Sequence, residues 1–133
     1  MRNRRGWSVF FFICALILNS ACTGQSDPTA AFTRPLEIEL AIEPETIYKG
    51  EKALIEAIVI QGTQRVSDAS EAVFEISKKG ENDIETIVAT AKGNGKYAVE
   101  KIFAQVGTYT VKAKVTAQDL TAVKSQVLTI KEE

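Results

Sequence analysis

An antiparallel β-sandwich is the fold class that the sequence predicts for residues 36–133, and three observations predict it. Apolar and polar residues alternate along several short segments, which is the period of a half-buried strand. Segments of this kind recur about seven times, and turns with glycine, proline or asparagine separate them. Residues 36–133 contain no stretch with the 3.6-residue period of an amphipathic helix.

The first three predicted strands differ in how much of each is buried. The segment "LEIELAIE" at 36–43 alternates strictly, and its glutamates, among them Glu37 and Glu39, share the solvent face. The segment "ALIEAIVIQ" at 53–61 is apolar on both faces, which predicts a central strand. The segment "EAVFEIS" at 71–77 alternates again. The glutamates of the segment at 36–43 are interpreted as a solvated strand face, because acid–base catalysis needs a cleft.

A hairpin joins the next two predicted strands. Residues 84–91, "IETIVATA", and residues 96–103, "KYAVEKIF", are both rich in β-formers. Between them stands Asn94-Gly95, the dipeptide that two-residue hairpin turns favour because both turn residues need a positive φ.

The last two predicted strands complete the sandwich. In "TYTVKAKV" at 108–115, alternate residues starting from Tyr109 point inward. In "AVKSQVLTI" at 122–130 the apolar residues change phase, which predicts a bulge near 125–127.

Seven short antiparallel strands predict a sandwich of the immunoglobulin-like type. Tyr109 stands near the start of a late strand, where such sandwiches use a tyrosine to close a corner. About 100 residues can hold this core without a disulfide.

Composition excludes several classes of function. The chain has 133 residues, 45% of them hydrophobic, and a net charge of -1, so no strong positive field attracts nucleic acid. It has no histidine, which excludes Ser–His and Cys–His catalytic pairs. Its two cysteines, Cys14 and Cys22, precede the predicted sandwich, so no disulfide or thiolate metal site is expected there. We expect no cofactor, no metal and no enzymatic activity.

Residues 1–21 have the layout of a secretory signal. Basic "MRNRR" precedes the apolar run "WSVFFFICALIL", which ends in small residues. An uncleaved membrane anchor stays open as an alternative, although a span needs about 20 apolar residues. Cleavage by ordinary signal peptidase is a second alternative.

The end of this signal resembles a bacterial lipoprotein box. Ser20 and Ala21 are small residues before Cys22, whereas Asn19 stands where leucine is usual. The resemblance implies cleavage before Cys22 and lipidation of its sulfur, and two or more acyl chains give a stable membrane anchor. Residues 22–35 then form a polar tether, and residues 36–133 form the sandwich.

One loop is the candidate site for a partner protein of the cell envelope. It is the polar segment "RVSDAS" at 65–70, because loops on a rigid scaffold commonly carry recognition. Its candidate residues are Arg65, Val66, Ser67, Asp68 and Ser70. The alternative is a structural turn in which Asp68 and Ser70 bond their own backbone.

Two other groups of charged residues have simpler explanations. The acidic segment "GENDIE" at 80–85 lacks the spacing of a calcium loop and reads as a polar hairpin tip. Lys112 and Lys114, with Lys101, form at most a small basic stripe, which a solvated face explains.

Several segments taken together resemble the YtkA-like domain of bacterial lipoproteins, which is related to the FixH-like family. The matching residues are Pro44, Gly50, Gly80, Phe103, "QG" at 61–62, "VSDASEAVFEI" at 66–76, "GNGKY" at 93–97 and "GTYTVKAKVTAQDL" at 107–120. The resemblance implies this fold and a lipid anchor on the outer face of a Gram-positive cell membrane.

The sequence departs from this family at positions that would suit copper. Relatives often carry histidine in the strand that matches "VKAKVTA" at 111–117, where this chain has Lys114. They often carry methionine and histidine in the segment that matches "AQDLTAVK" at 117–124, where this chain has Leu120, Thr121 and Val123. We therefore expect a non-enzymatic, lipid-anchored binding or accessory module. The alternative is a copper-handling envelope lipoprotein that has lost its His and Met ligands.

Overall fold

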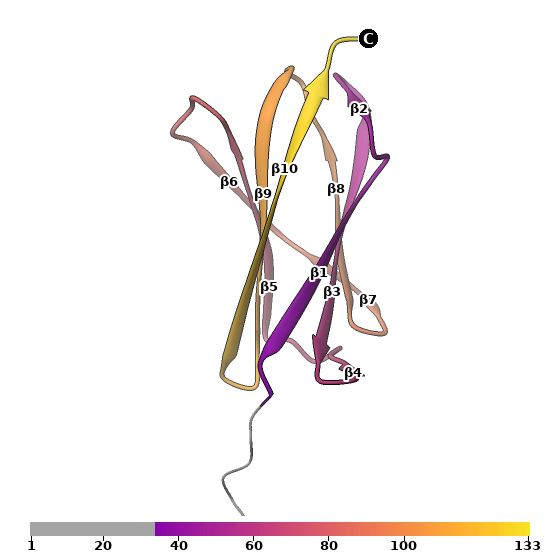
Figure 1. Cartoon of the computed structure of the whole chain (residues 1–133), viewed down its shortest axis with the longest axis vertical. Helices are drawn as coiled ribbons and strands as arrows, with labels where there is room; N and C mark the ends of the chain where they lie inside the picture. The colour runs from indigo at the N-terminus through magenta and orange to yellow at the C-terminus, as the bar shows by residue number, and fades with distance from the viewer. Residues whose placement is uncertain (1–33) are drawn as a thin grey trace, which may run out of the picture. The chain divides into compact units, whose positions relative to one another are not determined.

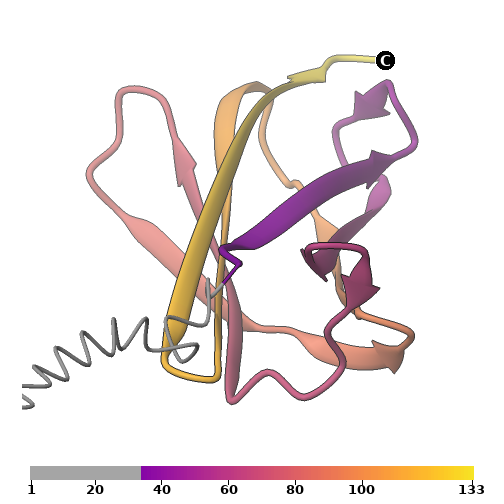
Figure 2. The same ribbon diagram turned by 60° about the horizontal axis from the view of Figure 1, so that its bottom comes forward.

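Two β-sheets make up the part of the chain that the structure, a computed structural model, describes, which is residues 34–133. The first sheet contains β1 (Leu36–Glu43), β3 (Lys52–Gln61), β8 (Lys96–Ile102) and β7 (Thr90–Gly93), with β4 (Gln64–Arg65) paired to β3. The second contains β2 (Ile47–Tyr48), β10 (Leu120–Lys131), β9 (Gly107–Ala117), β5 (Glu71–Lys78) and β6 (Ile84–Val88). The two sheets form separate layers (Figures 1 and 2).

The order of the strands confirms the predicted immunoglobulin-like sandwich. The order β1-β3-β8-β7 in one sheet, and β10-β9-β5-β6 in the other, is that of the immunoglobulin arrangement with one added edge strand. Neighbouring strands are antiparallel except for β2, which pairs in parallel with the end of β10. No helix within residues 34–133 is long and apolar enough to span a membrane.

The strand predicted at 84–91 is in fact two strands in different sheets. β6 pairs with β5, and β7 pairs with β8, so the chain crosses between the sheets at Ala89. The amide of Ala89 donates a hydrogen bond of 2.9 Å to the carbonyl of Ala72. The sequence "IETIVATA" has no glycine or proline to mark this crossing, which is why it read as one strand. The two-residue strands β2 and β4 are also additions to the seven predicted strands.

The bulge predicted near residues 125–127 is wrong. β10 pairs with β9 in one continuous register, from Leu120 opposite Ala117 to Ile130 opposite Gly107. The change of apolar phase is real, but it leaves Val123 and Val127 on the outer face of the sheet rather than kinking the strand. Their side chains are 55% and 63% exposed.

The core lies between the two sheets, and the inward residues of β3 and β9 dominate it. The predicted phase of β9 is confirmed, since Tyr109, Val111, Ala113 and Val115 are all buried. Alternate residues of β3, and Phe74 from β5, pack against them. Burying these apolar side chains is the main stabilising term in a fold of this kind.

Two predicted turns are confirmed. Asn94 and Gly95 both have a positive φ, 54° and 74°, as a type I′ hairpin turn requires. At the corner between β8 and β9, the hydroxyl of Tyr109 donates a hydrogen bond of 2.9 Å to the carbonyl of Gln105. This is the corner contact expected of a tyrosine at that place.

Candidate functional site

The candidate partner loop lies at the end of the sandwich where β1 begins and β4 lies (Figure 1). Ser67, Asp68 and Ser70 are exposed, as a recognition loop requires. Arg65 belongs to β4 and is also exposed. Val66, by contrast, is only 6% exposed and belongs to the core, so it holds the loop in place rather than meeting a partner.

Hydrogen bonds from β8 and its turn fix the conformation of this loop. The buried hydroxyl of Tyr97 donates to the carbonyl of Val66 and accepts from the amide of Ala69, both at 3.1 Å. The amide of Gly95 donates to Oγ of Ser67 at 2.8 Å. The alternation of residues along β8 predicts no such contact, and only the fold brings the hydroxyl of Tyr97 to the loop. The carbonyl of Val66 and the amide of Ala69 therefore both have a protein partner, as buried backbone groups usually do.

The alternative of a structural turn, in which Asp68 and Ser70 bond their own backbone, does not hold for Ser70. Its hydroxyl donates to the carbonyl of Thr116 at 3.1 Å, and its amide donates to the same carbonyl at 2.9 Å. Both bonds tie the loop to β9 instead of closing a local turn. The exposed carboxylate of Asp68 thus stands on a loop held at both ends.

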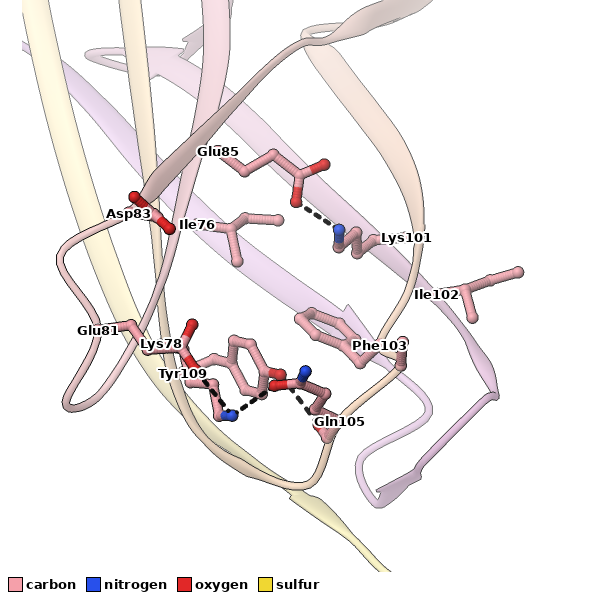
Figure 3. Close-up of a pocket in the computed structure, with 11 residues that line it drawn as sticks. Ile76, Lys78, Glu81, Asp83, Glu85, Lys101, Ile102, Phe103, Gln105 and Tyr109 are labelled. Carbon is pink, nitrogen blue, oxygen red and sulfur yellow. Dashed lines mark hydrogen bonds and ion pairs between the residues drawn. The ribbon is translucent and has the colours of Figure 1, made fainter.

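A cavity of ≈ 290 Å³ lies at the opposite end of the sandwich (Figures 1 and 3). The β5–β6 turn and the β8–β9 corner line it. Its apolar lining comes from Ile76, Phe103 and Tyr109, whose two aromatic rings meet edge to face at 4.9 Å between centroids. A volume near 300 Å³ is at the lower limit for small-molecule sites.

Charged side chains surround the mouth of this cavity and pair with one another. Nζ of Lys78 donates to Oε1 of Glu81 at 3.0 Å and to Oε1 of Gln105 at 2.7 Å. Lys101 pairs with Glu85 across the gap between the two sheets (Figure 3). Ion pairs at the surface of a protein add little stability.

The acidic segment at 80–85 does not gather its oxygens around one point. Glu81 and Glu85 face different lysines, as the hairpin-tip interpretation expects. Within residues 34–133 no cluster of three or more acidic side chains could hold a metal ion.

Lys101 does not share a surface with Lys112 and Lys114, so a basic stripe would comprise only the two lysines of β9. Lys101 belongs to β8 of the first sheet, whereas Lys112 and Lys114 belong to β9 of the second. Lys112 is also paired with Glu75 on the neighbouring strand. Cross-strand pairing to an acid thus offsets much of the positive charge on β9.

The positions at which the resemblance implies metal ligands partly converge. Lys114 lies directly opposite Val123 in the β9–β10 pair. The hydroxyls of Thr116 and Thr121 lie 3.0 Å apart two pairs further along, on the same face of the sheet. Leu120 has the opposite parity and is half-buried. An ammonium, a hydroxyl and an aliphatic group do not form a copper site, since copper prefers imidazole and sulfur ligands.

Part of the sequence-based prediction lies outside the described residues. This part consists of the signal at 1–21, the cleavage residues Asn19, Ser20 and Ala21, the lipidation residue Cys22 and most of the tether at 22–35.

Comparison with known protein families covers most of the described sandwich. A family model described as YtkA-like matches residues 30–114, a range that includes the loop at 65–70 and the cavity. No curated protein matches the chain.

Proposed function

The chain belongs to the YtkA-like family, and on that premise we propose that it is a lipid-anchored, extracytoplasmic binding module without enzymatic activity. The partner it serves is a protein of the cell envelope. Cys22 carries the anchor, residues 23–35 form the tether, and the sandwich presents the binding surface.

The observation that carries the binding role is the fixed loop at 65–70. Tyr97, Ser67 and Ser70 hold it through hydrogen bonds to the rest of the sandwich, while Asp68 stays exposed. A loop held in one conformation loses less entropy on binding than a free loop does. The arrangement suits recognition of a partner by a preformed surface.

The residue types of the chain support a role without catalysis. The commonest general base, histidine, is absent from the sequence, and both cysteines precede the sandwich. In the cavity, Lys78 and Lys101 are each engaged by a carboxylate.

Replacing Cys22 by Ala tests the anchor. We expect the variant either to leave the membrane fraction as released protein or to remain as uncut precursor. In both cases it should incorporate no labelled lipid, because the thioether-forming sulfur is gone. The matched control is Cys14→Ala, whose cysteine lies within the apolar run that cleavage discards. Full lipid labelling of the Cys22→Ala chain would refute the anchor.

A photo-crosslinking residue in place of Asp68 tests the binding role. We expect it to form one discrete adduct with an envelope protein in intact cells, since Asp68 is exposed on the fixed loop. The same residue in place of Asn82, which is exposed beside the cavity at the other end of the sandwich, is the matched control. An adduct from Asn82 alone would place the partner at the cavity and contradict the loop.

A further inference from the structure

The outer face of the sheet β6-β5-β9-β10 carries exposed apolar side chains on its two flanking strands, β6 and β10. Within residues 34–133, six large hydrophobic side chains are exposed, and four of them lie on this face. Ile84 and Val88 are 62% and 75% exposed on β6, and Val123 and Val127 are 55% and 63% exposed on β10. Exposed apolar patches on a folded protein often mark an interaction site.

The strand register aligns these four side chains in pairs across the sheet. Val88 on β6 and Val123 on β10 belong to the same cross-strand row, through Val73 and Lys114 between them. Ile84 and Val127 belong to another shared row, four residues away along the strands, through Ser77 and Thr110. The outer face therefore has one apolar column along β6 and a matching one along β10.

Charges of both signs lie between the two columns, and they are sorted by strand. The acids Glu71 and Glu75 belong to β5, whereas Lys112 and Lys114 belong to β9. Glu75 lies directly opposite Lys112 in the row between the two apolar rows and forms an ion pair with it. Two acids and two bases leave this face without net charge, so a second copy of it is not repelled.

Two copies can stack these faces about a two-fold axis in only two simple ways. An axis parallel to the strands brings β6 of one copy onto β10 of the other, and β5 onto β9. Val88 then meets Val123 of the second copy, and Glu75 meets Lys112 of the second copy. An axis across the strands would instead set β5 on β5, with Glu75 against Glu75, and like charges in contact are unfavourable.

We infer that this face binds a second copy of the chain, as a symmetric dimer whose two-fold axis runs along the strands. Such an interface is self-complementary, because the same patch serves on both copies. The axis also leaves both β1 strands starting at the same end of the dimer. That point rests on the proposed anchor at Cys22, since two chains held in one membrane need their tethers on the same side.

The size of the patch indicates how strong the dimer is. β5, β9 and β10 each contribute about eight residues to this face and β6 contributes five. With strands about 4.8 Å apart and about 3.4 Å per residue, the face covers about 500 Å² per copy. The total of about 1,000 Å² is at the lower limit for a specific interface. We therefore expect a weak dimer in solution and a well-populated one in the membrane, where confinement raises the effective concentration.

Cysteine crosslinking of the full chain in isolated membranes tests the geometry. The double variant Val88→Cys/Val123→Cys should form a covalent dimer on mild oxidation. Within one chain these positions lie three strand spacings apart, about 14 Å, too far for a disulfide between them. The matched control is Val88→Cys/Ile102→Cys, because Ile102 is 55% exposed but belongs to β8 of the other sheet. Equal dimer yields from the two variants would overturn the proposal.

Charge reversal in the crosslinking variant tests the partner strands. Glu75→Lys or Lys112→Glu alone should lower the dimer yield at least about tenfold, because each sets like charges against each other across the interface. Expressing the two reversed chains together should restore the yield, since each supplies the charge that the other needs. Loss without restoration, or an adduct of Val88→Cys with a different protein, would overturn the proposal.

A released chain separates the dimer from the anchor. Cys22→Ala in the crosslinking background removes the proposed lipid without changing the outer face. We expect specific crosslinking of this chain when it is purified and concentrated. Its absence there and in membranes would refute the dimer alone, whereas fractionation reports on the anchor independently.

Discussion

Replacing Tyr109 by Ala is expected to lower the free energy of unfolding by about 3–5 kcal/mol. The ring is 9% exposed and packs edge to face against Phe103, which is itself fully buried. Truncation would remove this contact, enlarge the cavity that Tyr109 lines and release the corner between β8 and β9. Urea unfolding followed by circular dichroism measures the loss.

Tyr109→Phe is the matched control for that substitution. It keeps the ring and removes only the hydrogen bond to the carbonyl of Gln105, so we expect a loss of about 1 kcal/mol. A loss below about 1 kcal/mol for Tyr109→Ala would mean that the ring is not part of the core.

Gly95→Ala is expected to cost about 2–4 kcal/mol, through backbone strain and a steric clash together. Gly95 has a φ of +74°. An added Cβ would lie 2.8 Å from Cβ of Arg65 and 2.9 Å from the carbonyl oxygen of Val59. The turn would have to move away from β3, and the loop at 65–70 would lose its bond from the Gly95 amide.

Gly80→Ala is the matched control, because Gly80 has a φ of +90° and nothing lies within 4 Å of an added Cβ. This substitution carries the strain alone, about 1–2 kcal/mol. Equal losses of unfolding free energy for the two variants would show that the turn at Gly95 does not press against β3.

The parts of the fold that were predictable are those that local chemistry decides. The alternation around Tyr109 has a period of two, and one face of β9 must be buried, so its phase follows directly. Asn94-Gly95 needs only its own backbone preferences to form the turn. In both cases no distant residue enters the argument.

The parts that were not predictable depend on pairing between distant strands. The crossing at Ala89 is decided by which sheet each half of 84–91 joins, and its residues suit either sheet. The same limit hid the hydroxyl of Tyr97 from the candidate loop, 28 residues away from Ala69. The cross-strand rows of the outer face, too, can be assigned only once the register of β6, β5, β9 and β10 is known.

The placement of the two ends of the sandwich has a mechanical consequence. β1 starts at one end and β10 finishes at the other (Figure 1). Opposed forces on the start of β1 and the end of β10 would slide β1 along β3 and β10 along β9. Those ladders run without a break from Leu36 to Glu43 and from Leu120 to Ile130, so their hydrogen bonds would share the force instead of opening one by one. The two outer ladders therefore resist force along the strands better than they would resist peeling from one end.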